Sequence, residues 1–334
     1  MNTAAAIETP PELAHTKALV AADMVRVNEL IISYAQSDIP LIGQMVRHLV
    51  LSGGKRLRPA LVLICAKMMG YENGDRHIAL ASAVEFIHTA TLLHDDVVDE
   101  SELRRGEETA NEVWGNSASV LVGDYLLSRA FQLMVSDGNL KVLKILSDAS
   151  AIIAQGEVLQ LTTANALETT TEQYLQVISG KTATLFAAAC ELGAVVTDRD
   201  DWEAPLRNFG MNLGIAFQMM DDALDYSAKQ EALGKSVGDD FRDGKITLPI
   251  IQAFAQGDAD EKAFWQRTLG EQEQNEADLT TALELLNKHQ AVEHTVNVAR
   301  EYCDKALQQI EALPNNAEKK ALLEIANFCI NRDY

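Results

Sequence analysis

The chain has 334 residues, of which 47% are hydrophobic and 23% are charged, and its formal net charge is −21. This composition is typical of a soluble globular protein with a large core, and the acidic surface argues against binding to nucleic acid or to anionic lipid. An anionic substrate would therefore need a local cationic site.

Taken in chain order, the sequence begins with residues 1–15, which we predict to form a loose tail. The tail lacks a basic region followed by an apolar one, so it does not indicate a secretory signal. The remainder is rich in helix-forming residues, and apolar residues recur every three or four positions. This pattern predicts helices over Leu57–Met69, Ala79–Val98, Ser117–Met134, Leu140–Leu161, Thr171–Leu192 and Trp202–Tyr226.

The most apolar span, residues 182–196, is interrupted by Glu191 and is too short for a bilayer, which needs ~20 apolar residues. Residues 257–281 are polar and predict an exposed excursion or a solvated helix. The chain has neither an alternating strand pattern nor a linker rich in proline, glycine or serine. We therefore predict that residues 16–334 form a single all-α domain without an integral membrane segment.

The four cysteines indicate a cellular compartment. Cys65, Cys190, Cys303 and Cys329 lie far apart, show no CxxC spacing, and each occupies an apolar or helical stretch. Reduced core thiols in a cytoplasmic protein are the expected explanation.

A short acidic motif occurs twice, each time at the end of an apolar helical pattern. ATLLHDDVVDES (residues 90–101) resembles AFQMMDDALDYS (residues 216–227), and both contain DDxxD. Residues four apart share one face of a helix, so Asp95 pairs with Asp99 and Asp221 with Asp225. Such carboxylate pairs suit Mg²⁺, which is often completed by water and substrate phosphates, whereas the His and Cys ligands of zinc are missing from the spacing. One copy could equally be a solvated acidic face, but two copies favour a paired metal site.

Cationic residues accompany these motifs. GGKRLRP (residues 53–59) places Lys55, Arg56 and Arg58 before a helix, where they could hold a diphosphate or merely balance surface charge. Further basic or hydroxyl residues are Arg104 and Arg105 after the first motif, Lys181 and Thr182 where we expect an apolar helix to begin, and Lys235 and Lys245 around Asp239 and Asp240. His88 precedes Asp95 by seven residues, which places it about 20° away around the helix and predicts that both face one site.

With these motifs, the sequence resembles the trans-polyprenyl diphosphate synthases. GGKRLRP, DDVVDESELRRG, GKTATL, FQMMDDALDY and GKSVGDDFRDGKITLP stand in that family's order between residues 53 and 249. Within the family, the chain looks most like bacterial long-chain enzymes, which make octaprenyl to decaprenyl diphosphate for quinone side chains such as that of ubiquinone. The resemblance implies an antiparallel helical bundle around a deep central cavity, in a homodimer.

The resemblance also implies roles for individual residues. Three Mg²⁺ ions would bind to Asp95, Asp99 and Asp221. The other three aspartates of the motifs, Asp96, Asp222 and Asp225, would act through water or as second-sphere residues that do not bind the metal directly. An allylic diphosphate such as farnesyl diphosphate would be held by Arg104, Lys181, Thr182, Gln218, Lys235 and Lys245. Isopentenyl diphosphate would be held by Lys55, Arg58, His88 and Arg105. The role of Arg56 is left open, and Met211 replaces an arginine common in the family.

Residues before the first motif bear on product length. In the family, bulky aromatic residues four and five positions before the first aspartate stop the chain early. Here Thr91 and Ala90 occupy those positions, and both are small. We therefore expect the product tunnel to continue toward a floor for which the candidates are Ile87, Phe86, Leu133 and Met134. Ordinary core packing explains these four residues equally well.

Three alternatives remain beside the long-chain synthase. A class I terpene cyclase would carry a different second metal motif and would not need GGKRLRP. A shorter-chain synthase, for farnesyl or geranylgeranyl diphosphate, is opposed only by the small residues Ala90 and Thr91. A non-catalytic partner subunit should have lost ligands, whereas both acidic motifs are intact.

Overall fold

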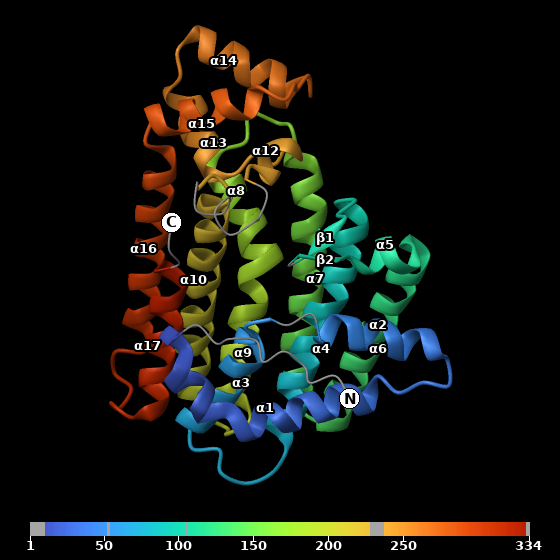
Figure 1. Ribbon diagram of the computed structural model, residues 1–334. Helices are drawn as coiled ribbons and strands as arrows, with labels where there is room; N and C mark the ends of the chain where they lie inside the picture. Colours follow the sequence, from blue (N-terminus) through green and yellow to red (C-terminus); the bar gives the residue numbers. More distant parts are fainter. Residues whose placement is uncertain (1–10, 52–53, 105, 228–236, 332–334) are drawn as a thin grey trace. The chain divides into compact units, whose positions relative to one another are not determined.

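The structure, a computed structural model, describes residues 11–51, 54–104, 106–227 and 237–331. Figure 1 shows them as helices joined by loops, with one small two-stranded ribbon, and the prediction of an all-α fold is confirmed. The described chain divides into two compact units. The first contains the residues up to Ser150 together with Leu185–Arg207 and Ala312–Ile325, and the second contains the others. That the chain forms a single domain stays a prediction.

The first unit is built mainly from the N-terminal half of the chain. Its elements are η1 (Pro11–Leu13, a 3₁₀ turn), α1 (Ala14–Tyr34), α2 (Pro40–Leu51), α3 (Leu57–Met68), α4 (Arg76–Val98), β1 (Leu103–Arg104), β2 (Glu107–Glu108), α5 (Ala110–Trp114), α6 (Asn116–Asp137), and parts of α7 (Leu140–Thr163), α9 (Thr184–Val195), α10 (Asp200–Leu224) and α17 (Ala317–Ile330). Residues 1–10 of the predicted tail lie outside the described residues, but helical structure is already present at Pro11–Leu13, before the predicted boundary at residue 16, and Leu13 is buried.

Three helices of this unit, α3, α4 and α9, are buried on nearly all sides. Their apolar residues surround the helix, which is the pattern of a core helix rather than a surface one. α4 packs against α6, α3 and α1. Small residues permit close crossings, because a Cβ atom on Gly193 of α9 would lie 2.3 Å from Cys65 Cβ of α3, and one on Gly123 of α6 would lie 2.3 Å from His94 Nε2 of α4.

The second unit contains the rest of α7 and α10, together with the helices between residues 239 and 309. Its further elements are α8 (Thr171–Ile178), η2 (Ser179–Ala183, a π-helical turn), α12 (Asp239–Arg242), α13 (Leu248–Gln256), α14 (Ala259–Trp265), η3 (Gln266–Gly270, a π-helical turn), α15 (Asp278–Lys288) and α16 (Ala291–Gln309). α13 packs against α16, α15, α14 and α8, which makes it the centre of this unit.

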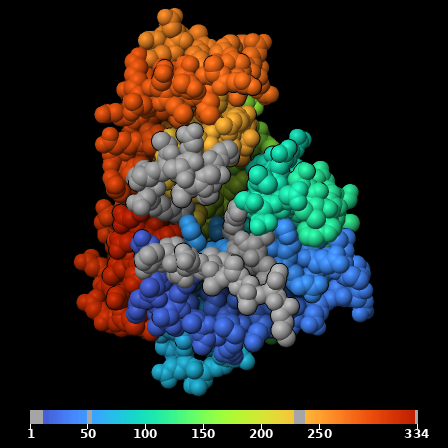
Figure 2. All heavy atoms as spheres, in the orientation of Figure 1, coloured from blue at the N-terminus to red at the C-terminus, as the bar shows by residue number. Residues whose placement is uncertain are grey.

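The segment at residues 257–281 is more than the solvated excursion that its polar composition indicates. Its few apolar residues face a core, and Trp265 is 0% exposed beside Phe241, with the ring centroids 6.2 Å apart. The side chain of Asp258 caps α14 by accepting hydrogen bonds from the backbone N–H groups of Asp260 and Glu261. Figure 2 shows the atoms of α14 and α15 gathered into one continuous body.

Within the residues that the structure describes, no helix combines the length and the apolar character that spanning a bilayer requires.

Candidate active site

The first acidic motif lies at the C-terminal end of α4. Asp95 lies in the last turn, and Asp99 caps the helix with its backbone N–H donating to Asp95 O at 2.7 Å. The chain then turns through Glu100, at φ 48°, and Ser101 N–H donates to Asp96 O at 2.9 Å, which closes the helix with a Schellman motif. Asp95 and Asp99 therefore keep the helical spacing that the sequence predicted.

Asp96 has a different environment, since it is only 1% exposed. Its Oδ1 atom accepts a hydrogen bond from Arg104 Nε at 2.7 Å and forms an ion pair with Arg104 Nη2 at 2.6 Å. Oδ2 is buried and has no hydrogen-bond partner among the described residues. The middle aspartate thus holds the arginine of β1, and both residues belong to the predicted site.

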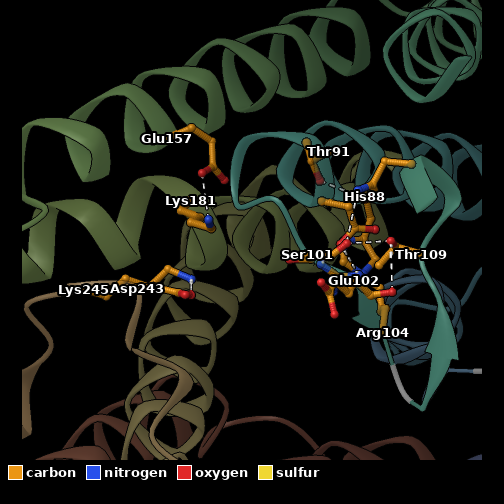
Figure 3. A network of polar contacts seen from close by, with 12 residues as sticks. His88, Thr91, Ser101, Glu102, Arg104, Thr109, Glu157, Lys181, Asp243 and Lys245 are labelled. Atoms are coloured by element: carbon orange, nitrogen blue, oxygen red, sulfur yellow. Dashed lines mark hydrogen bonds and ion pairs between the residues drawn. The ribbon is translucent and has the colours of Figure 1, made fainter. Parts of the chain in front are cut away.

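The turn that carries Arg104 is fixed by its own hydrogen bonds. β1 pairs antiparallel with β2, so that Arg104 lies opposite Glu107. Thr109 Oγ1 donates to Ser101 O at 2.6 Å, and Asn111 Nδ2 donates to the same oxygen at 3.1 Å. Figure 3 shows Ser101, Thr109 and Arg104 close together in this turn. Arg105 lies outside the described residues.

The second motif repeats this arrangement at the end of α10. Asp221 and Asp222 lie in the last turn, and Asp225 follows the helix with its N–H donating to Asp221 O at 3.1 Å. Neither α4 nor α10 has a basic residue in its last turn. The C-terminus of a helix carries partial negative charge, which disfavours carboxylates there. A bound cation would therefore stabilise both carboxylate clusters.

Asp222 is buried in a polar network within the second unit. Tyr174 Oη donates to Asp222 Oδ2 at 2.6 Å, and Gln218 Nε2 donates to Oδ1 at 2.8 Å. Thr182 Oγ1 in turn donates to Gln218 Oε1 at 2.8 Å. Burial raises the pKa of Asp222 to about 7, and the charges of Asp221 and Asp225 act in the same direction. The network links the motif to two predicted substrate ligands, Gln218 and Thr182.

Asp225 connects the motif to the segment after it. Its two carboxylate oxygens accept hydrogen bonds from the backbone N–H groups of Asp239, at 3.2 Å, and Asp240, at 3.1 Å. Burial raises the pKa of Asp225 to about 6, against the opposing effect of these hydrogen bonds. Burial and the nearby Asp225 charge also raise the pKa of Asp240. Several carboxyl groups thus share a small region that a cation would stabilise.

In the first unit, the basic segment at the start of α3 separates its arginines. Arg56 adopts a left-handed conformation at φ 49° and forms an ion pair with the buried Glu85 of α4. Arg58 points elsewhere, with Nη1 3.2 Å from His88 Nε2 and its guanidinium 4.5 Å from the ring centroid of Phe186. The predicted pair Arg58 and His88 is therefore brought together. Arg56 contacts Glu85 instead, which indicates a role in holding this segment.

Lys55, the other cation that the sequence places here, is exposed.

In the second unit, both described lysines of the predicted site lie beside carboxylates. Lys181 Nζ is 2.7 Å from Glu157 Oε2, and Lys245 Nζ is 3.0 Å from Asp243 Oδ2 (Figure 3). Lys181 lies in the π-helical turn η2 between α8 and α9. The expectation that Lys181 and Thr182 begin a helix is wrong, because the preceding residues already continue the helix of α8.

Lys235 lies outside the described residues.

The residues predicted to control product length lie on α4 and α6 of the first unit. Ile87, Ala90 and Met134 are buried, as are Phe86 and Leu133, whereas Thr91 is half-buried with Oγ1 donating to His88 O at 2.8 Å. Ala90 and Thr91 lie about one helical turn before Asp95. This packing fits both a tunnel wall and an ordinary core, so their role stays a prediction.

The donor chemistry of the motifs fits a hard divalent cation. Among the described residues, no three His, Cys, Asp or Glu side chains form a ready-made metal cage. Mg²⁺ rarely uses such a cage, because it keeps water and is bound by one or two carboxylates plus substrate phosphates. The carboxylates at two helix C-termini and the buried oxygen Asp96 Oδ2 agree with this mode of binding.

Sequence reasoning missed Tyr174, Glu157 and Phe186, which contact residues of the predicted site, and Glu85, which contacts Arg56. Each of these contacts joins residues that are distant in sequence, and no motif marks them. The one available signal was a repeated Gly-plus-charge pair, GE at residues 156–157 and GK at residues 180–181.

Comparison with known proteins gives concordant matches. The sequence model of the polyprenyl synthetase family matches residues 39–286. The chain is 46% identical to an octaprenyl diphosphate synthase of Escherichia coli, covering 94% of this chain and 97% of the relative. A decaprenyl diphosphate synthase structure from Rhodobacter capsulatus superposes with a TM-score of 0.92 at 47% identity, covering 96% and 99% of the two chains. A polyprenyl synthase from Caulobacter crescentus, complexed with calcium and isoprenyl diphosphate, also gives 0.92, at 48% identity and with 96% and 98% covered.

Proposed function

The chain belongs to the polyprenyl synthetase family, and on that premise we propose that it is a long-chain prenyltransferase. It condenses an allylic diphosphate with successive isopentenyl diphosphates and gives an all-trans polyprenyl diphosphate of octaprenyl to decaprenyl length. The observation that carries this proposal is the repeated DDxxD motif, each copy ending a helix whose last turn contains no basic residue. The octaprenyl and decaprenyl synthases among its relatives support the product length.

Mg²⁺ is the proposed metal, with Asp95, Asp99 and Asp221 as its protein ligands and three ions per site when substrate is bound. Bound Mg²⁺ would neutralise negative charge on the diphosphate leaving group. The calcium and isoprenyl diphosphate in the Caulobacter crescentus relative support a divalent cation. The other aspartates of the motifs have supporting roles: Asp96 positions Arg104, Asp222 positions Gln218, and Asp225 holds the first two backbone N–H groups of α12.

Two sets of side chains are proposed to bind the two diphosphates. The allylic diphosphate is held by Arg104, Lys181, Thr182, Gln218, Lys235 and Lys245. Isopentenyl diphosphate is held by Lys55, Arg58, His88 and Arg105. In support, Thr182 and Gln218 are hydrogen-bonded to each other, as are Arg58 and His88. Arginine suits this task because its planar donors match phosphate oxygens.

The reaction needs charge stabilisation rather than a protein nucleophile. As the allylic C–O bond breaks, negative charge grows on the diphosphate, and the cations named above stabilise it. The alkene of isopentenyl diphosphate then attacks the allylic cation, forming the new C–C bond. A proton is lost to the departing diphosphate. Apolar surroundings are required, because water would quench the cation.

The proposed product length depends on two small residues of α4. Ala90 is buried and Thr91 is half-buried one turn before the metal motif, and neither carries a bulky ring. The growing chain would pass these residues and stop deeper, near Ile87 or Met134. A shorter-chain synthase or a non-catalytic partner subunit is the alternative. We propose that the product supplies the side chain of ubiquinone.

We also propose a homodimer. On α6, Val120, Leu121, Phe131 and Val135 are exposed, with Leu121 at 67%. The four lie within about 100° of the helix circumference, and such an apolar stripe suits a second copy of the chain. If sedimentation gives a monomer for the wild-type chain, or a dimer that Leu121→Glu leaves intact, this assignment is wrong. A cytoplasmic location remains a prediction, supported by the four buried thiols.

The proposed function is tested by elongation. Purified protein is incubated with Mg²⁺, farnesyl diphosphate and labelled isopentenyl diphosphate, and the products are separated by chromatography. Products of eight to ten isoprene units are expected. Absence of elongation would refute the activity, and products of three or four units would support the shorter-chain alternative. Asp95→Asn should abolish elongation, whereas Asp148→Asn, at an exposed acid of α7, should not.

A further inference from the structure

Lys181 and Glu157 form a partly shielded ion pair within the second unit. Lys181 Nζ lies 2.7 Å from Glu157 Oε2, and the two side chains are only 23% and 26% exposed. Another Lys–acid pair on α7, Lys144 with Asp148, has the same distance but is 74% and 54% exposed. Exposed pairs contribute little because water screens them. Glu157 therefore acts on Lys181 more strongly than a surface carboxylate would.

The backbone fixes this pair in place. A Cβ atom on Gly156 would lie 2.5 Å from Lys181 N and 2.9 Å from Gly180 C, and one on Gly180 would lie 3.1 Å from Gly156 Cα. α7 and the turn η2 therefore meet backbone to backbone at two glycines. The residue after each glycine is the charged one, so the crossing brings Glu157 and Lys181 together.

The local helix geometry also sets the position of Lys181. η2 spans Ser179–Ala183, and Thr184 Oγ1 donates to Ser179 O at 2.9 Å across the turn. A π-helical turn inserts one extra residue into a helix and is frequent at functional sites. It rotates the following side chains relative to a regular helix. Thr182, next to Lys181, already contacts Gln218 in the network of Asp222.

We propose that Glu157 is a positioning residue, which holds the Lys181 ammonium group where it binds the allylic diphosphate. This inference rests on the proposed function, because it takes that diphosphate as the target of Lys181. A lysine side chain has a long flexible stem, and ordering it costs rotamer entropy. A carboxylate partner orders the stem before substrate arrives. An ammonium group carries three donors, so it can bind a carboxylate and phosphate oxygens together.

The test compares Glu157→Ala and Glu157→Gln with the wild-type chain. Glu157→Ala should raise the KM for farnesyl diphosphate about 10- to 100-fold, with the KM for isopentenyl diphosphate changed by less than about twofold. Glu157→Gln keeps an accepting oxygen and should restore much of the loss. In a Lys181→Ala background, Glu157→Ala should have no further effect, because the residue acts through that lysine. Asp148→Ala is the matched control, and its kinetics should equal those of the wild-type chain.

Three results would overturn the inference. The first is a KM for farnesyl diphosphate that is lower in Glu157→Gln than in the wild-type chain, which would mean that Glu157 competes with substrate. The second is an equal rise of both KM values in Glu157→Ala. The third is an effect of Glu157→Ala that stays undiminished when Lys181 is replaced by alanine.

A binding experiment separates this inference from the proposed function. Calorimetry with inorganic pyrophosphate and Mg²⁺ should show weaker binding to Glu157→Ala than to the wild-type chain, even if neither protein elongates a prenyl substrate. Equal affinities would refute the positioning role. Absence of elongation by the wild-type chain would refute the proposed function alone.

Discussion

Without a divalent cation, Asp222 should make the folded chain less stable as the pH rises from 5 to 8. Burial raises the pKa of Asp222 from 3.8 to about 7, so the folded state binds the proton more tightly than the unfolded state does. The resulting stabilisation is fully present below pH ~4 and is lost as the pH rises through ~7. Asp225, with a pKa of about 6, contributes with the same sign.

The size of the effect follows from the shift of Asp222. Each pKa unit corresponds to about 1.4 kcal/mol, and the part of the shift that titrates between pH 5 and pH 8 is about two units, or ~3 kcal/mol. A chain of 334 residues has an unfolding entropy of about 0.7 kcal/mol/K near 60 °C. The expected loss in Tm is therefore about 4 °C.

The assay is thermal unfolding followed by calorimetry in a chelator at pH 5, 6, 7 and 8. Asp222→Asn is the control, because it keeps the size of the side chain but cannot titrate. The wild-type chain should lose about 4 °C more than this variant between pH 5 and pH 8. Saturating Mg²⁺ should reduce the difference, since a bound cation favours ionised carboxylates. Parallel curves in the chelator, or a wild-type chain that gains stability toward pH 8 relative to the variant, would refute the reasoning.

Four further substitutions probe the site. Tyr174→Phe removes the 2.6 Å hydrogen bond to Asp222 and should lower the free energy of unfolding at pH 8 by about 1.5–3 kcal/mol; no change in urea unfolding would contradict the network. Phe186→Leu removes the ring that lies 4.5 Å from the Arg58 guanidinium and should raise the KM for isopentenyl diphosphate about 10-fold. An equal rise in the KM for the allylic substrate would argue against a role of this ring in binding isopentenyl diphosphate through Arg58. Ala90→Tyr, or Thr91→Phe, should shorten the products seen by chromatography, and an unchanged distribution would make the tunnel assignment wrong.

Much of the helical structure was predictable because its signal is local. Apolar residues every three or four positions marked the helices that end at Val98 and Leu224, and the acidic motifs at those ends were read directly from the sequence. The segment at residues 257–281 was harder. Its composition is polar, and only the folded chain shows that Trp265 and Leu269 face a core.

The sequence by itself determined much of the helical structure, the order of the motifs and the family, because each depends on residues close together in the chain. Only the tertiary structure decided which charged groups meet. Asp96 holds Arg104 across a turn, Asp222 is held by Tyr174, and Lys181 by Glu157. The last two contacts join residues on different helices, so they depend on how the helices cross. Close packing at two glycines sets the crossing that joins Glu157 to Lys181, and burial surrounds Tyr174 and Asp222; no short motif encodes either.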